Sequence, residues 1–140
     1  MELLIVIAVI GILGAIAIPS YSSYQDKIKI TTCIAGIRAM EQTILLHRLK
    51  TGSLPADLSE AGLGSERDPW GNVYQYLNMS DNGANGHCRK DHNLHPLNTD
   101  FDLYSMGPDG QSSPPLTASH SRDDILRAND GNFIGEASKY

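Results

Sequence analysis

The sequence of 140 residues (15.2 kDa) is long enough for one domain with a modest hydrophobic core. Its formal net charge is −5, and its 11 lysines and arginines form no basic run, which argues against a nucleic-acid-binding surface. Acidic residues gather after residue 90, where they indicate a solvent-exposed face or a bound cation.

The N-terminal segment is apolar without interruption over residues 3–18. Glu2 precedes this run, and the next charged residue is Asp26. A buried core helix would present a polar face, and a secretory signal would lead into a small-residue cleavage site, whereas this run leads into Pro19. The uncharged stretch reaches the ~20 residues that cross a bilayer. The pattern therefore predicts a helix that resides in a membrane, at least transiently.

The helical pattern continues beyond Lys27 as a single apolar stripe. Its apolar positions follow helical spacing: Ile30, Ile34, Ile37, Met40, Ile44 and Leu45. No turn signal separates the two halves, and Thr51-Gly52 offers a C-terminal stop. The sequence thus predicts one helix of about fifty residues, ~75 Å long, that is apolar all round in its first half and amphipathic in its second. Pro19 removes one backbone hydrogen bond, so a kink or local break is expected there.

The rest of the chain predicts a small sheet packed on this helix. Residues 53–68 form a long connection that is expected to wrap the helix with its leucines docked. Residues 73–77 and 101–105 have the composition of strands, the second with Phe101 and Leu103 on one face. A small antiparallel sheet over the amphipathic stripe gives an α+β fold shaped like a ladle.

Three stretches of the chain resemble a known family. Residues 2–19, ELLIVIAVIGILGAIAIP, resemble the N-terminal segment of type IV pilins and of type II secretion pseudopilins. Residues 68–76, DPWGNVYQY, and residues 102–110, DLYSMGPDG, resemble the globular domain of major pseudopilins. The resemblance implies the pilin ladle fold. Residues 1–25 would be the hydrophobic helix that anchors in the membrane and later enters the filament core, and residues 26–140 the globular head.

The start of the chain departs from the family pattern. In the family the acid is the fifth residue of the mature chain, which begins with a methylated aromatic residue after a leader that ends in glycine. Here the acid, Glu2, is the second residue. We therefore expect Met1 to be an internal methionine and the mature protein to begin upstream of it.

Glu2 is a candidate assembly residue. An unpaired carboxylate in hydrocarbon is costly, so it must be protonated, lie at the interface, or find a positive partner. An acid in the first turn also complements the helix dipole, which is worth ~0.3 to 1 kcal/mol. The resemblance implies that Glu2 pairs with the N-terminal amine of an adjacent subunit, and that Pro19 is where the helix can unwind locally inside a filament.

The acids near the C-terminus are candidates for a bound cation. Asp109-Gly110 and the Asp123-Asp124 pair offer carboxylates beside a glycine turn, although their spacing is not that of an EF-hand. The resemblance implies a Ca²⁺ loop in which Asp109, Asp123 and Asp124 supply side chains and Met106 supplies a carbonyl. A solvated acidic turn is the alternative.

Two cysteines complete the set of candidate residues. An exported chain reaches an oxidising compartment, so Cys33 on the helix and Cys88 in the loop region are expected to form a disulfide. A buried, unpaired Cys33 with an exposed Cys88 is the alternative. No motif for a nucleophile, phosphate loop or haem is present, so no enzymatic activity is expected.

Two classes of function fit these features. The first is a major pilin, a structural subunit that polymerises with identical copies through its N-terminal helix into an extracellular type IV pilus-like filament. The major pseudopilin of a type II secretion system is the variant that works in the periplasm. The second class is a monomeric binding domain tethered to the membrane. For the first class the resemblance implies inner-membrane residence before assembly, and prepilin peptidase and the filament assembly machinery as partners.

Overall fold

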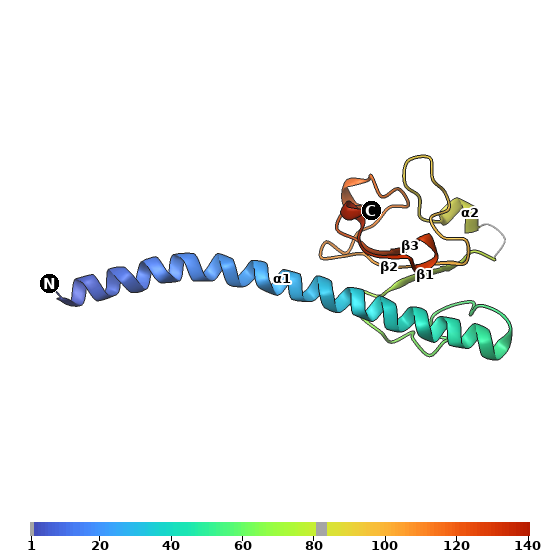
Figure 1. Ribbon diagram of the computed structural model, residues 1–140, viewed down its shortest axis with the longest axis horizontal. Coiled ribbons are helices and arrows are strands. Elements are labelled where there is room, and N and C mark those ends of the chain that lie inside the picture. Colours follow the sequence, from blue (N-terminus) through green and yellow to red (C-terminus); the bar gives the residue numbers. More distant parts are fainter. Residues whose placement is uncertain (1, 81–83) are drawn as a thin grey trace.

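The computed structural model describes residues 2–80 and 84–140; of Pro19 and Asn85 it describes only the backbone. A single helix, α1 (Glu2–Thr51), runs the length of the molecule and projects far beyond the head (Figure 1). The predicted helix is thereby confirmed. α1 continues through Pro19 without interruption, so the local break expected there is absent from this structure. Its end is also as predicted, because Gly52 has a φ of 85° and its N–H donates to the Arg48 carbonyl at 2.8 Å.

The head contains one four-stranded antiparallel sheet in the order β1-β2-β3-β4. The strands are β1 (Gln75–Asn78), β2 (Phe101–Ser105), β3 (Ile125–Ala128) and β4 (Phe133–Glu136). Short helical elements interrupt the loops: α2 (Ala84–His87), η1 (Ser119–Ser121), η2 (Asn129–Gly131) and η3 (Ala137–Lys139). The predicted strand at 101–105 is confirmed at the same bounds. The one predicted at 73–77 begins two residues later, since Val73 only bridges to Arg67.

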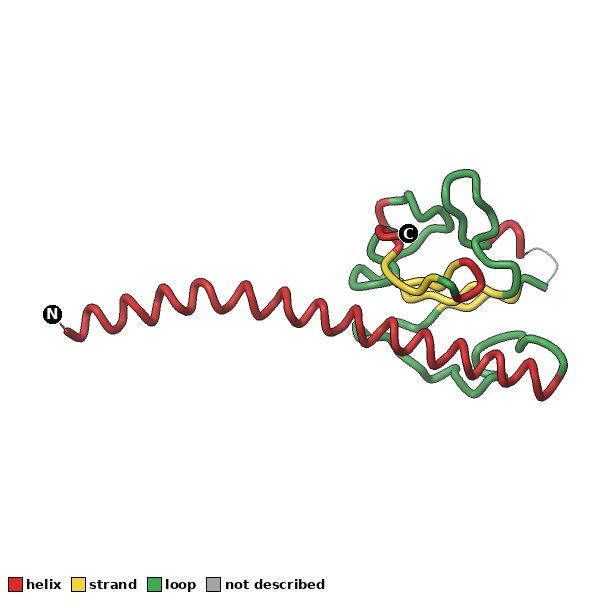
Figure 2. The backbone as a smooth tube through the Cα atoms, viewed as in Figure 1, coloured by secondary structure: helices red, strands yellow, loops and turns green. Residues whose placement is uncertain are grey.

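The sheet separates two layers of the head. α1 lies against one face, and α2 with the long loops lies over the other (Figure 2). The strands alternate accordingly, with Phe101 and Leu103 in the cluster against α1 and Tyr104 packed on the opposite side with Leu116 and Leu126. The connection after α1 returns along the helix, with Leu54, Leu58, Ala61 and Leu63 packed on the α1 cluster. The α+β ladle fold is therefore confirmed.

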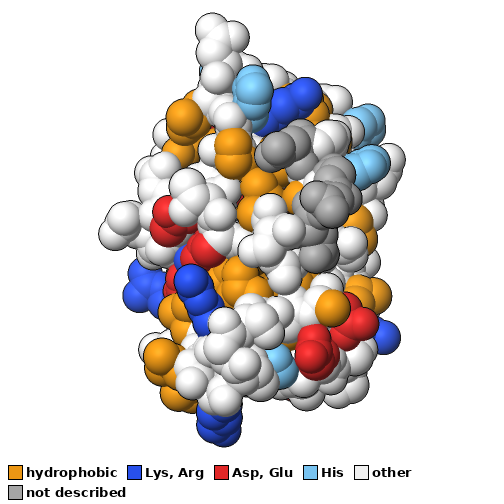
Figure 3. All heavy atoms as spheres, turned by 90° about the vertical axis from the view of Figure 1, so that its right-hand side faces the viewer, with side chains coloured by type: hydrophobic (Ala, Val, Ile, Leu, Met, Phe, Trp, Pro, Cys, Tyr) orange, Lys and Arg blue, Asp and Glu red, His pale blue; other side chains and the backbone are white. Residues whose placement is uncertain are grey.

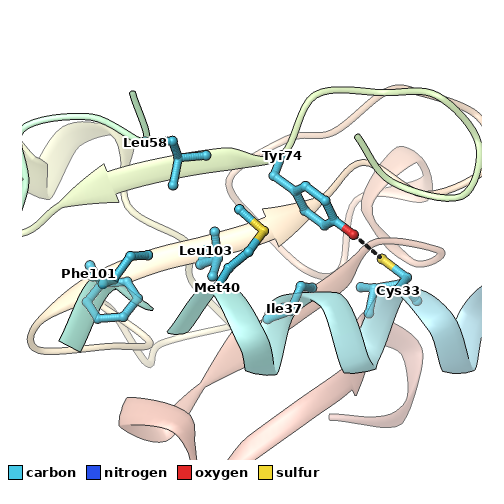
Figure 4. Close-up of a cluster of buried hydrophobic side chains, with 9 residues drawn as sticks. Cys33, Ile37, Met40, Leu58, Tyr74, Phe101 and Leu103 are labelled. Carbon is cyan, nitrogen blue, oxygen red and sulfur yellow. Dashed lines mark hydrogen bonds between the residues drawn. The ribbon is translucent and has the colours of Figure 1, made fainter. Parts of the chain in front are cut away.

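The core lies between the second half of α1 and the sheet. Cys33, Ile37, Met40 and Ile44 are buried, and Ile30, Ile34 and Leu45 flank them, which confirms the predicted stripe. Figure 4 shows Cys33, Ile37 and Met40 of α1 facing the sheet, with the Tyr74 hydroxyl donating to Cys33 Sγ at 3.8 Å. Burial raises the pKa of both the Tyr74 phenol and the Cys33 thiol. The stripe fixes the helix to the head, and the first half of α1 is left without cover.

Candidate functional site: an exposed apolar helix and the head that carries it

The first half of α1 is an apolar surface that the chain itself does not cover. Leu3 is 77% exposed and Ile18 is 73% exposed, and the large apolar side chains between them are exposed as well. Within the described residues, α1 is the one helix long and apolar enough to cross a membrane. A contiguous apolar patch of this size marks a surface that binds lipid or another protein.

The two glycines of this apolar surface face open space in the described part of the chain. A Cβ placed on Gly11 or Gly14 would meet no atom within 4 Å. Glycine in a helix interior costs roughly 1 kcal/mol relative to alanine, and no contact inside this molecule offsets that cost. Small residues on apolar helices let neighbouring helices approach closely.

Both predicted assembly residues lie on α1. Glu2 is an exposed acid in its first turn, at the tip of the apolar surface and far from the head (Figure 1). Pro19 lies in the same helix, and its side chain is outside the described part of the chain. The structure thus places Glu2 where no polar group of the head reaches it, and its pairing with another subunit stays a prediction.

The two head motifs that carry the family resemblance are hydrogen bonded to each other. The buried carboxylate of Asp68 accepts bonds from the backbone N–H groups of Trp70 and Asn72, and from the Ser105 hydroxyl at 2.6 Å. The Asn72 amide donates to the Gly107 carbonyl at 2.9 Å. These bonds join the turn after Asp68 to the end of β2.

A buried arginine joins α1 to the sheet. The Arg127 side chain, on β3, is 1% exposed and pairs with Glu41 of α1 at 2.6 Å and with Asp100 at 2.7 Å. Its guanidinium carbon lies 4.1 Å from the centre of the Phe101 ring. Burial by itself would lower the pKa of Arg127, but the hydrogen bonds to Asp100 and Glu41 outweigh that effect, so the pKa of Arg127 is raised. The sequence did not lead us to this residue. The feature that could have marked Arg127 as a buried, paired side chain is its charge within the apolar run of residues 125–128.

Two of the four predicted calcium ligands meet. The N–H of Asp109 donates to Asp123 Oδ2 at 3.4 Å, so these two residues adjoin. Met106 is half-buried at the end of β2. Gly107 follows with a φ of 65°, and a Cβ on it would lie 2.4 Å from the Asp123 carbonyl oxygen. The close approach of residues 107–109 to Asp123 therefore depends on that glycine.

The fourth predicted ligand points elsewhere. The Asp124 side chain is 0% exposed, and its Oδ2 lies 2.6 Å from Arg89 Nη2 and accepts a 2.6 Å bond from the Ser112 hydroxyl. Burial raises the pKa of Asp124 to about 6, against the opposing effects of Ser112 and Arg89. Over residues 2–80 and 84–140, no three His, Cys, Asp or Glu side chains converge as a metal-binding group. Ca²⁺ takes six to eight oxygen ligands, so the set fits this ion only in part, and calcium stays a prediction.

The predicted disulfide is wrong for this structure, because Cys33 and Cys88 are not joined. Both residues are buried, but the sheet lies between them. Cys33 belongs to the cluster on the α1 face. α2 lies over the opposite face (Figure 1), and Cys88 directly follows it, next to Arg89, whose N–H donates to Asp102 at 2.6 Å. Two thiols on opposite faces of a sheet cannot reach the ~2 Å of an S–S bond without rearrangement.

Comparison with known proteins finds relatives of two kinds. The type II secretion system core protein G of Pseudomonas aeruginosa is 27% identical over 131 residues, which cover 79% of this chain and 81% of that protein. The fimbrial protein of Neisseria meningitidis is 30% identical over 80 residues, covering 57% and 47%. The type IV major pilin protein PilE of Neisseria gonorrhoeae is 34% identical over 64 residues, covering 46% and 38%.

The other two comparisons give no match. No protein-family model matches the chain. No solved structure matches it either. The apolar segment of residues 2–19 and the long helix packed on a small antiparallel sheet therefore belong to a chain whose homologues are type II secretion core proteins G and type IV pilins.

Proposed function

We propose that this protein is a structural subunit that polymerises through α1 into a type IV pilus-like filament, as a major pilin. One observation carries the proposal: the large apolar side chains in the first half of α1 are exposed, and the same helix continues without a break into the core of the head. A simple anchor needs no rigid connection to its head. A subunit whose heads must repeat at fixed positions along a polymer does.

The helix has two environments in turn. Before assembly its apolar half lies in the inner membrane, and after assembly it lies among the helices of neighbouring subunits. Glu2 is costly in the first environment and is paired with a positive group of a neighbour in the second. Prepilin peptidase and the assembly machinery are the partners that such a route requires.

The head is the outward part of the filament. The end of the head that faces away from the apolar helix shows hydrophobic, acidic and basic side chains interspersed (Figure 3). Mixed charges without a large apolar patch suit a surface in contact with water. The protein acts through assembly rather than through catalysis, in keeping with relatives that carry pilin and secretion-protein names.

A second candidate is the major pseudopilin of a type II secretion system. The match to the core protein G of Pseudomonas aeruginosa covers 81% of that protein, whereas the matches to the two neisserial pilins cover less than half of each. This coverage favours a pseudopilin-like head. It leaves the filament and the role of α1 unchanged.

Immunogold electron microscopy of cells that produce the protein distinguishes these functions. Antibody to the head should label continuous filaments outside the cell if the protein is a pilin. Labelled filaments confined to the periplasm would favour the pseudopilin. Label spread over the membrane with no polymer in any preparation would exclude both and leave a tethered monomer.

A further inference from the structure

Arg89 is a buried cation beneath the loop of residues 111–116. Its side chain is 2% exposed, and Nη2 lies 2.6 Å from Asp124 Oδ2. Nη1 donates to the Ser113 carbonyl at 2.8 Å and to the Ser112 hydroxyl. The Ser112 hydroxyl donates in turn to Asp124. One guanidinium thus gathers a carboxylate, a carbonyl and a hydroxyl from two segments.

The backbone around Arg89 is fixed to the same loop. The Lys90 N–H donates to the Pro114 carbonyl at 3.0 Å, and the Leu116 N–H donates to the Lys90 carbonyl at 2.9 Å. Toward the sheet, the Arg89 N–H donates to Asp102, and the guanidinium carbon lies 4.4 Å from the centre of the Tyr104 ring. Arg89 therefore connects the loop to β2 on one side and to the start of β3 on the other.

The groups that Arg89 gathers are oxygen ligands of the kind that Ca²⁺ takes. We propose that the Arg89 guanidinium is the internal cation of this loop, and that the head folds and holds residues 111–124 in place without Ca²⁺. The side chain neutralises Asp124, which is the role that the metal would have according to the family resemblance.

The surroundings of Asp124 leave little room for a second cation. A divalent ion that bound Asp124 would lie close to the positive charge of Arg89, and that repulsion is strong where water is excluded. Among the described buried atoms, Asp124 Oδ1 has no hydrogen-bond partner, and neither has Arg89 Nε. Asp109 and Asp123 would supply only some of the oxygen ligands of Ca²⁺. One further carboxylate oxygen, next to a guanidinium, does not complete that coordination shell.

Thermal unfolding of the full chain in detergent micelles tests the metal part of the proposal directly. The melting temperature should be the same in EGTA and in excess CaCl₂, because the Arg89 guanidinium already neutralises Asp124. A specific site filled well above its Kd would raise the melting temperature by several degrees. A calcium-dependent rise in the wild-type protein would overturn the proposal.

Variants of Arg89 test whether the guanidinium stabilises the head. Arg89→Gln should lower the melting temperature by roughly 10 °C or more, because a buried carboxylate loses its partner. Arg122→Gln, at an exposed arginine of the same region, is the matched control and should change it little. If Arg89→Gln does not fold, Arg89→Lys is the variant to use, because lysine keeps the positive charge but lacks the planar set of N–H donors of the guanidinium.

Amide hydrogen exchange on the Arg89→Lys variant gives a local readout. The Leu116 amide should exchange about tenfold faster than in the wild-type chain, because the loop is released, while the Leu126 amide in β3 should keep its rate. Unchanged exchange at Leu116 would show that the loop does not depend on the guanidinium, and would contradict the proposal.

Discussion

Arg127 Nε of β3 donates a 2.6 Å hydrogen bond to Glu41 Oε1 of α1, and this pair ties the projecting helix to the sheet. The guanidinium also holds Asp100 through both carboxylate oxygens, at 2.7 and 2.8 Å. Because α1 is the element that we propose to polymerise, this contact sets how the head sits on the polymer.

Loss of the Arg127 side chain should loosen the head from the helix. Arg127→Met removes the buried guanidinium that Glu41 and Asp100 share, and breaking a buried ion pair costs about 3 kcal/mol or more of unfolding free energy. Urea unfolding in detergent, followed by circular dichroism, measures it. Arg38→Met, at an exposed arginine of α1, is the control. Equal stability of the two variants would show that the pair does not hold the helix.

Gly107→Ala should destabilise the head more than Gly71→Ala. Both glycines have positive φ, 65° and 93°, so each variant carries backbone strain of roughly 1–2 kcal/mol. Only Gly107 approaches another backbone closely, with the Asp123 carbonyl oxygen 2.4 Å from an added Cβ, whereas Gly71 has open space. The difference in unfolding free energy between the two variants therefore measures the close approach, and no difference would refute it.

Both thiols should be alkylated after unfolding without any reductant. Cys33 is fully buried, and burial raises the pKa of its thiol, so iodoacetamide should leave it unmodified in the folded chain at neutral pH. In denaturant both cysteines should react. A peptide pair joined through Cys33 and Cys88, found by mass spectrometry under non-reducing conditions, would contradict the structure.

Asp130 should contribute to acid sensitivity. Its carboxylate accepts bonds from the Thr99 N–H at 2.7 Å and the Thr99 hydroxyl at 2.8 Å, and these outweigh partial burial and lower the pKa of Asp130 below 3.8. The unfolded chain then binds the proton more readily, so the contribution is fully present above pH ~4 and is lost as the pH falls through the folded pKa.

Asp130→Asn is a clean test of this effect. Asparagine tolerates the positive φ of 54° at this position. The variant should be less stable at neutral pH, and its unfolding free energy should fall less than that of the wild type between pH 5 and pH 2. Parallel pH profiles of the two proteins would show that Asp130 does not titrate differently on folding.

The long helix and one strand could be predicted because their signals are local. The apolar stripe of α1 has the period of a helix over many turns, and residues 101–105 alternate as a half-buried strand does. The hairpin of β3 and β4 was not predicted. Residues 125–128 are all buried, so they show no alternation, and a charged Arg127 stands among them. The signal that could have found it is the Asn129-Asp130-Gly131 turn between two short apolar runs.

The partners of the acids and the thiols could not be predicted because they are far apart in the sequence. Nothing near Asp124 indicates that a guanidinium from residue 89 neutralises it. Likewise, no local pattern shows that the sheet separates Cys33 from Cys88. Such outcomes depend on which face of the sheet each loop covers, and this is decided by the packing of the whole head.

Glu2 and the apolar half of α1 are the parts of the chain that we propose drive polymerisation. The most direct test is the yield of filaments, by shearing and electron microscopy, from cells producing Glu2→Gln in place of the wild-type chain, with Asp26→Asn, at the next acid along α1, as the control. Membrane fractions should contain all three proteins in equal amounts. Glu2→Gln should give no filaments, and Asp26→Asn should give normal filaments. Normal filaments from Glu2→Gln would contradict the proposal.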